Sequence, residues 1–250
     1  MNTVFHIATH ELRRLFYAPL AWILFAVVQF LLAIFFLLIL GRFIDPSTAT
    51  LFANYGATEI IVVGLLQITG ILLLLITPFV TMHTFSEERQ TGSIKLLLSS
   101  PISITELVLG KYLGVLGYLF LLLSLIALMP LSLLMGTELD LLQLLSALLG
   151  LVLLSSSFAA IGLFVSSLTS HPAVAAISTF GVLFVLWILN MAGNTGMELF
   201  RDILTYTSLL NHYHHLLDGI FNSADVIYYL LVSSVFIILS IWRLDNQRLY

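Results

Sequence analysis

The most densely charged part of the chain is the stretch FSEERQTGSIKLLLSSPIS, residues 85–103. It places Glu87, Glu88 and Arg89 in a row and adds Lys95, although only 9% of all residues are charged. Adjacent carboxylates and a guanidinium can form strong, charge-assisted hydrogen bonds with an oppositely charged surface. The residue types therefore indicate an ion-pairing surface that meets a partner.

Helix-capping and helix-breaking residues within this stretch predict which local structure carries the charges. Thr84 and Ser103 each precede a glutamate by three residues, which is the spacing of a helix capping box. Gly92 can end a short helix in a left-handed turn, and Pro101 ends the apolar run that follows. The pattern predicts a short charged helix, a glycine turn and a short apolar helix, which is more structure than a plain loop needs.

We interpret the stretch as a docking element in which apolar side chains serve as anchors beside the charges. The residues assigned to this docking surface are Glu87, Glu88, Arg89, Gly92, Ile94, Leu97 and Pro101.

Composition indicates the environment in which this element works. Of the 250 residues, 60% are hydrophobic, well above the half that is usual in a soluble domain. The chain has no cysteine, which excludes disulfides, iron–sulfur clusters and thiolate metal sites. A net charge of −4 argues against a nucleic-acid partner. These features predict an all-α protein in one membrane domain, residues 1–250.

Six apolar runs approach the roughly 20 residues that a membrane-spanning helix needs. They cover residues 20–41, 59–82, 108–131, 141–168, 172–191 and 226–242. Between the second and third lies a loop at 83–107, and an interfacial outer loop at 192–225 precedes the sixth.

Basic residues are distributed unevenly between the two ends of these spans. With the N-terminus in the cytoplasm, seven Lys or Arg residues fall inside and only two fall outside. The inside set is Arg13, Arg14, Arg89, Lys95, Lys111, Arg243 and Arg248, and the outside set is Arg42 and Arg201. The positive-inside rule therefore predicts that both termini and the 83–107 loop are cytoplasmic.

The N-terminal segment 3–17 precedes the first span and has its own amphipathic pattern. Its apolar residues share one helical face, whereas His6, His10, Arg13 and Arg14 fall opposite. Pro19 disfavours helix at the residue before it, which predicts a break. We expect an interfacial elbow helix whose basic face meets lipid headgroups.

Histidines in the outer loop raise the question of a metal site. His212, His214 and His215 lie near Asp218, and His214 and Asp218 would share a helix face. Histidines at a wet membrane interface more often serve as polar residues beside tyrosines. We therefore expect no metal here, with metal binding as the open alternative.

Small residues at Gly110, Gly114 and Gly117 predict a close approach between helices. We expect a partner helix within the same chain rather than a homodimer seam.

Two parts of the sequence resemble the type-2 ABC transporter permeases. Glu88-Arg89-x-x-Gly92, followed by Leu97-Leu98 and Pro101, is similar to the coupling region of that family. Residues 206–242 resemble the last loop and span of the gliding-motility-associated and nitrous-oxide-reductase-maturation branches.

The resemblance implies a permease subunit in the bacterial cytoplasmic membrane, with export as the expected direction of transport. It also implies a separate ABC ATP-binding subunit that docks beneath the 83–107 loop and carries the ATP and Mg²⁺. A second copy of this permease, or a related one, would complete the transporter, and a periplasmic accessory protein could contact the outer loop. The chain itself contains no G-x-x-x-x-G-K-[ST] phosphate loop, so we expect no catalytic residues and no cofactor in it.

Two alternatives belong to other classes of membrane protein. Glu87-Glu88-Arg89 is similar to the acidic pair of intramembrane CAAX-type proteases, for which only His83 and His171 could serve as histidine partners. A passive channel or structural membrane subunit is the second alternative, and an ATPase-binding test separates it from a transporter.

Overall fold

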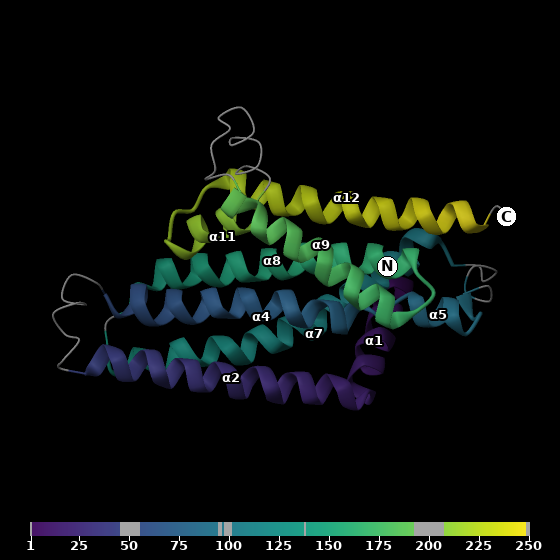
Figure 1. Ribbon diagram of the computed structural model, residues 1–250. Helices are drawn as coiled ribbons and strands as arrows, with labels where there is room; N and C mark the ends of the chain where they lie inside the picture. The colour runs from purple at the N-terminus through teal and green to yellow at the C-terminus, as the bar shows by residue number, and fades with distance from the viewer. Residues whose placement is uncertain are drawn as a thin grey trace.

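The structure, a computed structural model, describes residues 2–45, 56–94, 97, 102–137, 139–192 and 208–248, and these ranges contain helices and no strands. Figure 1 shows their arrangement. The elements are α1 (Asn2–Tyr17), α2 (Pro19–Ile44), the π-helical turn η1 (Thr58–Val62), α4 (Val63–Thr81), α5 (Ser86–Gln90), α7 (Ile104–Ser132), the 3₁₀ turn η2 (Leu133–Met135), α8 (Leu141–Leu168), α9 (Pro172–Ala192), α11 (Leu209–Leu217) and α12 (Ser223–Arg248).

Five helical segments of the described chain have the length and hydropathy of a membrane span. They are Pro19–Ile44, Thr58–Gln90, Ile104–Met135, Leu141–Leu168 and Ser223–Gln247. The predicted fifth span, 172–191, coincides with α9, whose described apolar part, Pro172–Ile188, is shorter than the other five. An all-helical protein with several membrane-spanning helices is confirmed, whereas the count of six stays a prediction.

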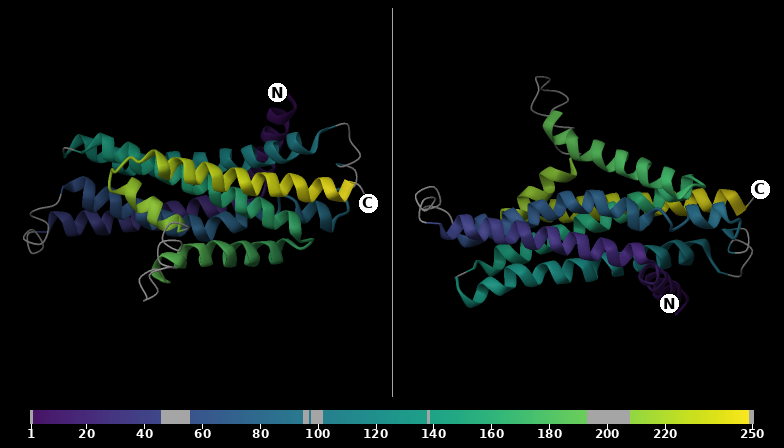
Figure 2. Two further views of the ribbon diagram at one scale, coloured as in Figure 1. Left: turned by 90° about the horizontal axis from the view of Figure 1, so that it is seen from above. Right: turned by 60° about the horizontal axis from the view of Figure 1, so that its bottom comes forward.

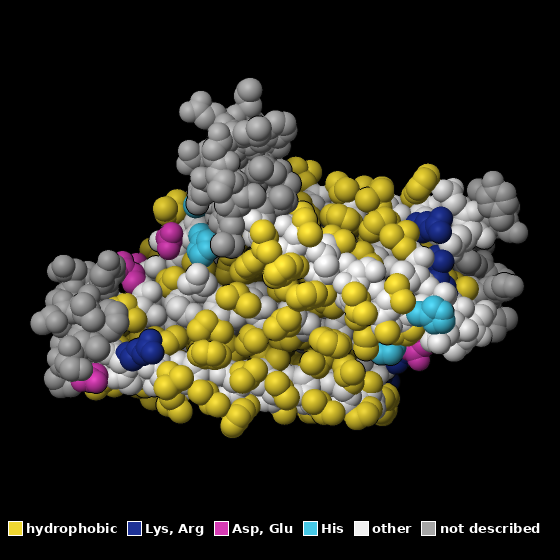
Figure 3. Space-filling view, viewed as in Figure 1, with side chains coloured by type: hydrophobic (Ala, Val, Ile, Leu, Met, Phe, Trp, Pro, Cys, Tyr) yellow, Lys and Arg dark blue, Asp and Glu magenta, His cyan; other side chains and the backbone are white. Residues whose placement is uncertain are grey.

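The long helices α2, α4, α7, α8 and α12 run side by side (Figure 1), and α8 packs against α4, α7, α9 and α12. Hydrophobic side chains cover the middle of the visible face, and charged side chains gather toward its two ends (Figure 3). Exposed apolar residues such as Trp22, Phe30 and Leu145 are expected where the solvent is lipid.

Helix α1 crosses the bundle near the end that also holds α5 and the C-terminus (Figures 1 and 2). The chain turns between α1 and α2 at Ala18, whose extended backbone (ψ 128°) precedes Pro19 at the start of α2. The break predicted from the proline is therefore confirmed.

Glycines on α7 allow α1 to approach closely. A Cβ added to Gly110 would lie 2.6 Å from the Cβ of Ile7, and one added to Gly114 would lie 2.6 Å from the Cβ of Glu11. Gly117 continues this surface against Leu12. The prediction that these glycines serve packing within the chain is confirmed, and the partner is the N-terminal helix.

At the opposite end, α11 is packed into the bundle. The Tyr213 hydroxyl donates to the carbonyl of Leu66 on α4 at 2.7 Å, and the Tyr229 hydroxyl of α12 donates to the carbonyl of Leu209 at 2.7 Å. Gly150 on α8 faces the side chain of Leu216. The predicted outer loop thus contains a buried helix, while its residues 193–207 lie outside the described part of the chain.

Candidate functional site

Helix α5 carries the Glu-Glu-Arg sequence, and the structure shows what holds it. Its N-cap is Phe85, which makes no side-chain capping bond, and the Thr84 hydroxyl is buried without a hydrogen-bond partner among the described residues. The capping box predicted at Thr84 is therefore wrong. The one predicted at Ser103 is confirmed, because Ser103 and Glu106 bond reciprocally at the start of α7.

A serine on a distant helix replaces the missing cap. The Ser166 hydroxyl of α8 accepts from the backbone N–H groups of Phe85 and Ser86 at 3.1 and 3.2 Å, and it donates to the carbonyl of Met82 at 3.2 Å. The first backbone donors of a helix need such acceptors. The start of α5 is thus fixed to the end of α8 rather than capped locally.

Lys111 of α7 bonds to α5, to α1 and to the turn between α4 and α5. Its ammonium donates to Glu88 Oε1 at 2.6 Å, to the carbonyl of Thr84 at 2.8 Å and to Glu11 Oε2 of α1 at 3.5 Å. It also sits 5.1 Å from the ring centroid of Phe85, within cation–π range. The side chain of Lys111 is only 4% exposed, so these partners take the place of water.

A second cation, Arg14, lies beside Lys111 and the two glutamates. Arg14 of α1 donates to Glu11 Oε1 at 2.6 Å and to the carbonyl of His83 at 3.2 Å, and its guanidinium lies 4.0 Å from Glu88. Arg14 thus pairs with the buried Glu11, while its side chain remains 29% exposed, and the predicted contact of this face with lipid headgroups stays a prediction. We call Glu11, Arg14, Glu88 and Lys111 the α5 charge cluster.

The α5 charge cluster contains two carboxylates and two cations, so its formal charges balance. Removing charges from water costs several kcal/mol per ion, and close pairing with additional hydrogen bonds offsets that cost. The cluster draws its members from three helices: Glu88 from α5, Lys111 from α7, and Glu11 and Arg14 from α1. A shift of α5 therefore changes the distances between its opposite charges.

Arg89 connects the same short helix to the C-terminal helix. It donates to Gln247 Oε1 of α12 at 2.6 Å. Glu88 and Arg89 are therefore both held by neighbouring helices, and Glu87 is the member of the triplet that is exposed. The sequence placed all three on one docking surface, whereas the structure divides them between an inner and an outer face.

The remaining docking residues lie beyond α5. Gly92 has φ +76°, the left-handed conformation expected after a short helix. Ile94 and Leu97 are partly buried and pack against the core of this chain. Pro101 lies outside the described residues.

A cavity of about 340 Å³ opens between α1 and the segment after α5. Its lining combines the apolar side chains of Leu97, Ile102 and Leu107 with the charged side chains of Glu88 and Lys111. His6 and His10 stand on its α1 side. A side chain of a partner protein that entered this cavity would lie next to the α5 charge cluster.

The geometry does not favour the protease alternative. His83 Nδ1 lies 3.4 Å from Glu87 Oε2, but the two side chains are 40% and 50% exposed, so the pair stands at the surface. His171 is also exposed, at the start of α9. Hydrolysis within a membrane would need a sheltered group instead.

Sequence reasoning missed the members of the site that lie far from residues 85–103. Lys111 was counted only as a basic residue, and Glu11, Ser166 and Gln247 had no assigned role. One signal was available: Lys111 is the one Lys or Arg inside the six predicted spans. Ionisable residues inside a span are costly and are usually paired for function.

Comparison with known proteins identifies the family of this chain. A family profile described as "ABC-2 family transporter protein" matches residues 5–249, nearly the whole chain. No curated protein matches the sequence.

Proposed function

Because the chain belongs to the ABC-2 family of transporter proteins and is a multi-pass membrane protein, we propose that it is the permease subunit of an exporter. In this proposal a separate ATP-binding subunit, which carries ATP and Mg²⁺, docks against α5 from the cytoplasm. Two permease copies, or this one and a related one, form the pathway in the bacterial cytoplasmic membrane. Helix α9 is the sixth span, since its 21 residues correspond to about 32 Å of helix against a hydrocarbon core of about 30 Å.

The observation that carries the proposal is the bond between Lys111 and Glu88 at 2.6 Å. It joins the short helix after α4 to the membrane helix α7 and, through Glu11, to α1. Packed elements that are joined in this way move together, which is the property required of a coupling element.

We assign different roles to the two faces of α5. Glu87 and Gln90 are exposed and contact the ATP-binding subunit. Glu88 and Arg89 face inward and pass the motion of α5 to α7 and α12. Closure of the ATPase would shift α5, and α4 and α7 would tilt with it.

Affinity purification tests this function. The permease, tagged and gently solubilised from its own host, is assayed for a bound ATP-binding subunit and for vanadate-sensitive ATPase activity. We expect both in the wild type and loss of at least one in Glu88→Ala/Arg89→Ala. Asp245→Ala serves as the control, because Asp245 is an exposed acid near the C-terminal end of α12.

Three results would argue against the proposal. A wild-type protein that purifies alone and without ATPase activity would reopen the channel and structural-subunit alternatives. A double variant with unchanged binding, ATPase activity and transport would remove α5 as the coupling element. Equal loss in Asp245→Ala would indicate a general charge effect.

A further inference from the structure

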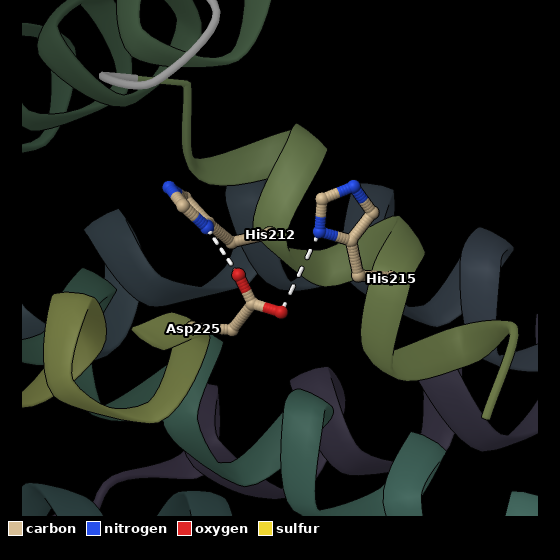
Figure 4. Close-up of side chains that lie close together, drawn as sticks. All are labelled: His212, His215 and Asp225. Carbon is tan, nitrogen blue, oxygen red and sulfur yellow. Dashed lines mark hydrogen bonds and ion pairs between the residues drawn. The ribbon is translucent and has the colours of Figure 1, made fainter. Parts of the chain in front are cut away.

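A second group of ionisable side chains lies at the opposite end of the bundle from α5. His212 and His215 lie on α11, and Asp225 lies in the first turn of α12. His212 Nδ1 is 2.6 Å from Asp225 Oδ1, and His215 Nδ1 is 3.5 Å from Asp225 Oδ2 (Figure 4). The two imidazoles thus face the two oxygens of one carboxylate.

The acid in this group is not the one that sequence spacing indicates. Asp218 follows α11 as its C-cap, and Asp225 replaces it in the group because the chain turns back after α11. That turn contains Gly219 at φ +78°, a conformation that glycine adopts without strain. The charge of Asp218 acts on His214 instead, where it opposes the burial that lowers the pKa of that imidazole.

Neighbouring contacts hold the three side chains in place. The His212 ring stacks on Tyr228 with centroids 4.1 Å apart. The bonds of Tyr213 to α4 and of Tyr229 to Leu209 fix α11 and α12 to the bundle and to each other. Such support limits the freedom of the His212 ring and fixes the backbones that carry His215 and Asp225, as a ligand site requires.

One oxygen of the Asp225 carboxylate lacks a hydrogen-bond donor among the described residues. The side chain of Asp225 is only 3% exposed, and its Oδ2 accepts no hydrogen bond from any residue that the structure describes. A buried acceptor left without a partner costs about 1–3 kcal/mol, and more when it is charged. His215 Nδ1 lies 3.5 Å from this oxygen, at ion-pair distance, but makes no hydrogen bond to it, so Oδ2 lacks a direct donor.

We propose that His212, His215 and Asp225 bind one divalent first-row transition-metal ion of the zinc class. Imidazole nitrogen and carboxylate oxygen are ligands that such an ion prefers, and their ligand atoms here all lie within 4.8 Å of one another. Ligands about 2.0–2.2 Å from a tetrahedral Zn²⁺ lie roughly 3.3–3.6 Å apart. The 3.5 Å between His215 Nδ1 and Asp225 Oδ2 falls in that range, whereas His212 Nδ1 and Asp225 Oδ1, hydrogen-bonded at 2.6 Å, would have to separate to admit the ion.

Three protein ligands leave a fourth position open to water or to another donor. The accessible side of the site is that of His215, whose side chain is 44% exposed. The ion would tie α11 to the start of α12, at the end of the bundle remote from the proposed ATPase contact. This inference does not depend on the proposed function.

Direct metal binding tests the proposal. The purified, detergent-solubilised chain without a polyhistidine tag is stripped with a chelator and dialysed against Zn²⁺, and bound metal is measured by mass spectrometry. We expect about one Zn²⁺ per wild-type chain. Co²⁺ should give the intense visible absorption of a tetrahedral site. Because loss of a supporting residue already costs 10–100-fold in affinity, loss of a ligand in His215→Ala should cost at least about tenfold.

Two variants keep the test decisive. His214→Ala is the matched control, since it removes a histidine from the same helix turn that is not in the group, and it should bind like the wild type. Asp225→Asn keeps the shape of the side chain while removing its charge and should weaken binding as His215→Ala does. Absence of stoichiometric Zn²⁺ in the wild type, unchanged affinity in His215→Ala, or equal weakening in His214→Ala would each overturn the proposal.

Discussion

At the scale of single residues, Lys111 is the side chain on which the α5 charge cluster most depends. It is the common partner of Glu11, Glu88 and the carbonyl of Thr84. Lys111→Met would keep the apolar stem while leaving Glu88 without its closest cation, whereas Glu11 keeps its bond to Arg14. Removing one partner from a buried ion pair costs about 3–5 kcal/mol. We expect that loss in the free energy of unfolding, measured by denaturant titration in detergent.

The matched control is Glu87→Gln, because Glu87 lies on the same helix with a half-exposed side chain. Surface changes of this kind usually alter stability by less than about 0.5 kcal/mol. In a double-mutant cycle, Glu88→Gln should recover part of the loss caused by Lys111→Met, since it neutralises one stranded carboxylate. Strict additivity of the two changes would show that the 2.6 Å contact carries no coupling.

Near α5, the sequence predicted the position of a short charged helix better than it predicted what the residues of that helix contact. Glu88 and Arg89 were singled out correctly as parts of a charged helix, but their partners Lys111 and Gln247 lie 23 and 158 residues away. Local spacing carries no information on such contacts. The same holds for His212, whose nearest acid by sequence is Asp218 and whose partner in space is Asp225.

At the scale of helices, the contact between α1 and α7 depends on the absence of side chains at two glycines. Gly114→Val would bring a Cβ to 2.6 Å from the Cβ of Glu11 and 2.9 Å from the carbonyl oxygen of Ala8. Because that oxygen belongs to the backbone, α1 must move away from α7. Its movement should also separate Glu11 from Lys111.

Site-directed labelling measures this movement, and the chain has no native cysteine to interfere. A cysteine introduced at Leu12, which packs against the core, should react with maleimide faster in the Gly114→Val protein than in the wild-type background. Gly181→Val is the control, since nothing lies within 4 Å of a Cβ at that position. Equal labelling rates in all three backgrounds would contradict a glycine-dependent contact.

Helix positions were the most predictable feature, because apolar length and proline are local signals. The predicted span 141–168 coincides with α8, and the predicted elbow 3–17 differs from α1 by one residue. One error has a tertiary cause. Thr84 does not cap α5 because Ser166 of α8 takes that role. Helix α12 begins at Ser223, before the predicted span, and there the contact is local: the N–H of Ala224 donates to Asn222 Oδ1 at 3.0 Å.

At the scale of the whole molecule, the two termini and α5 share one end of the bundle, and the His212–Asp225 group lies toward the other (Figures 1 and 2). That arrangement fits an even number of crossings and therefore agrees with the predicted six, of which α9 would be one; its described apolar part is shorter than the other five segments. The positive-inside rule predicts that the end with α5 is cytoplasmic, since most Lys and Arg residues of the described ranges lie toward that end.

Cysteine labelling in right-side-out membrane vesicles tests this orientation. Asp245 and Ser223 are exposed near opposite ends of the bundle, so each can be changed to cysteine with little disturbance of packing. A membrane-impermeant maleimide should label Ser223→Cys in intact vesicles and should label Asp245→Cys only after the vesicles are opened. The reverse pattern would place α5 outside the cell, where no ATP-binding subunit could reach it. Labelling of both sites in intact vesicles would mean that the segment between them does not cross the membrane as proposed.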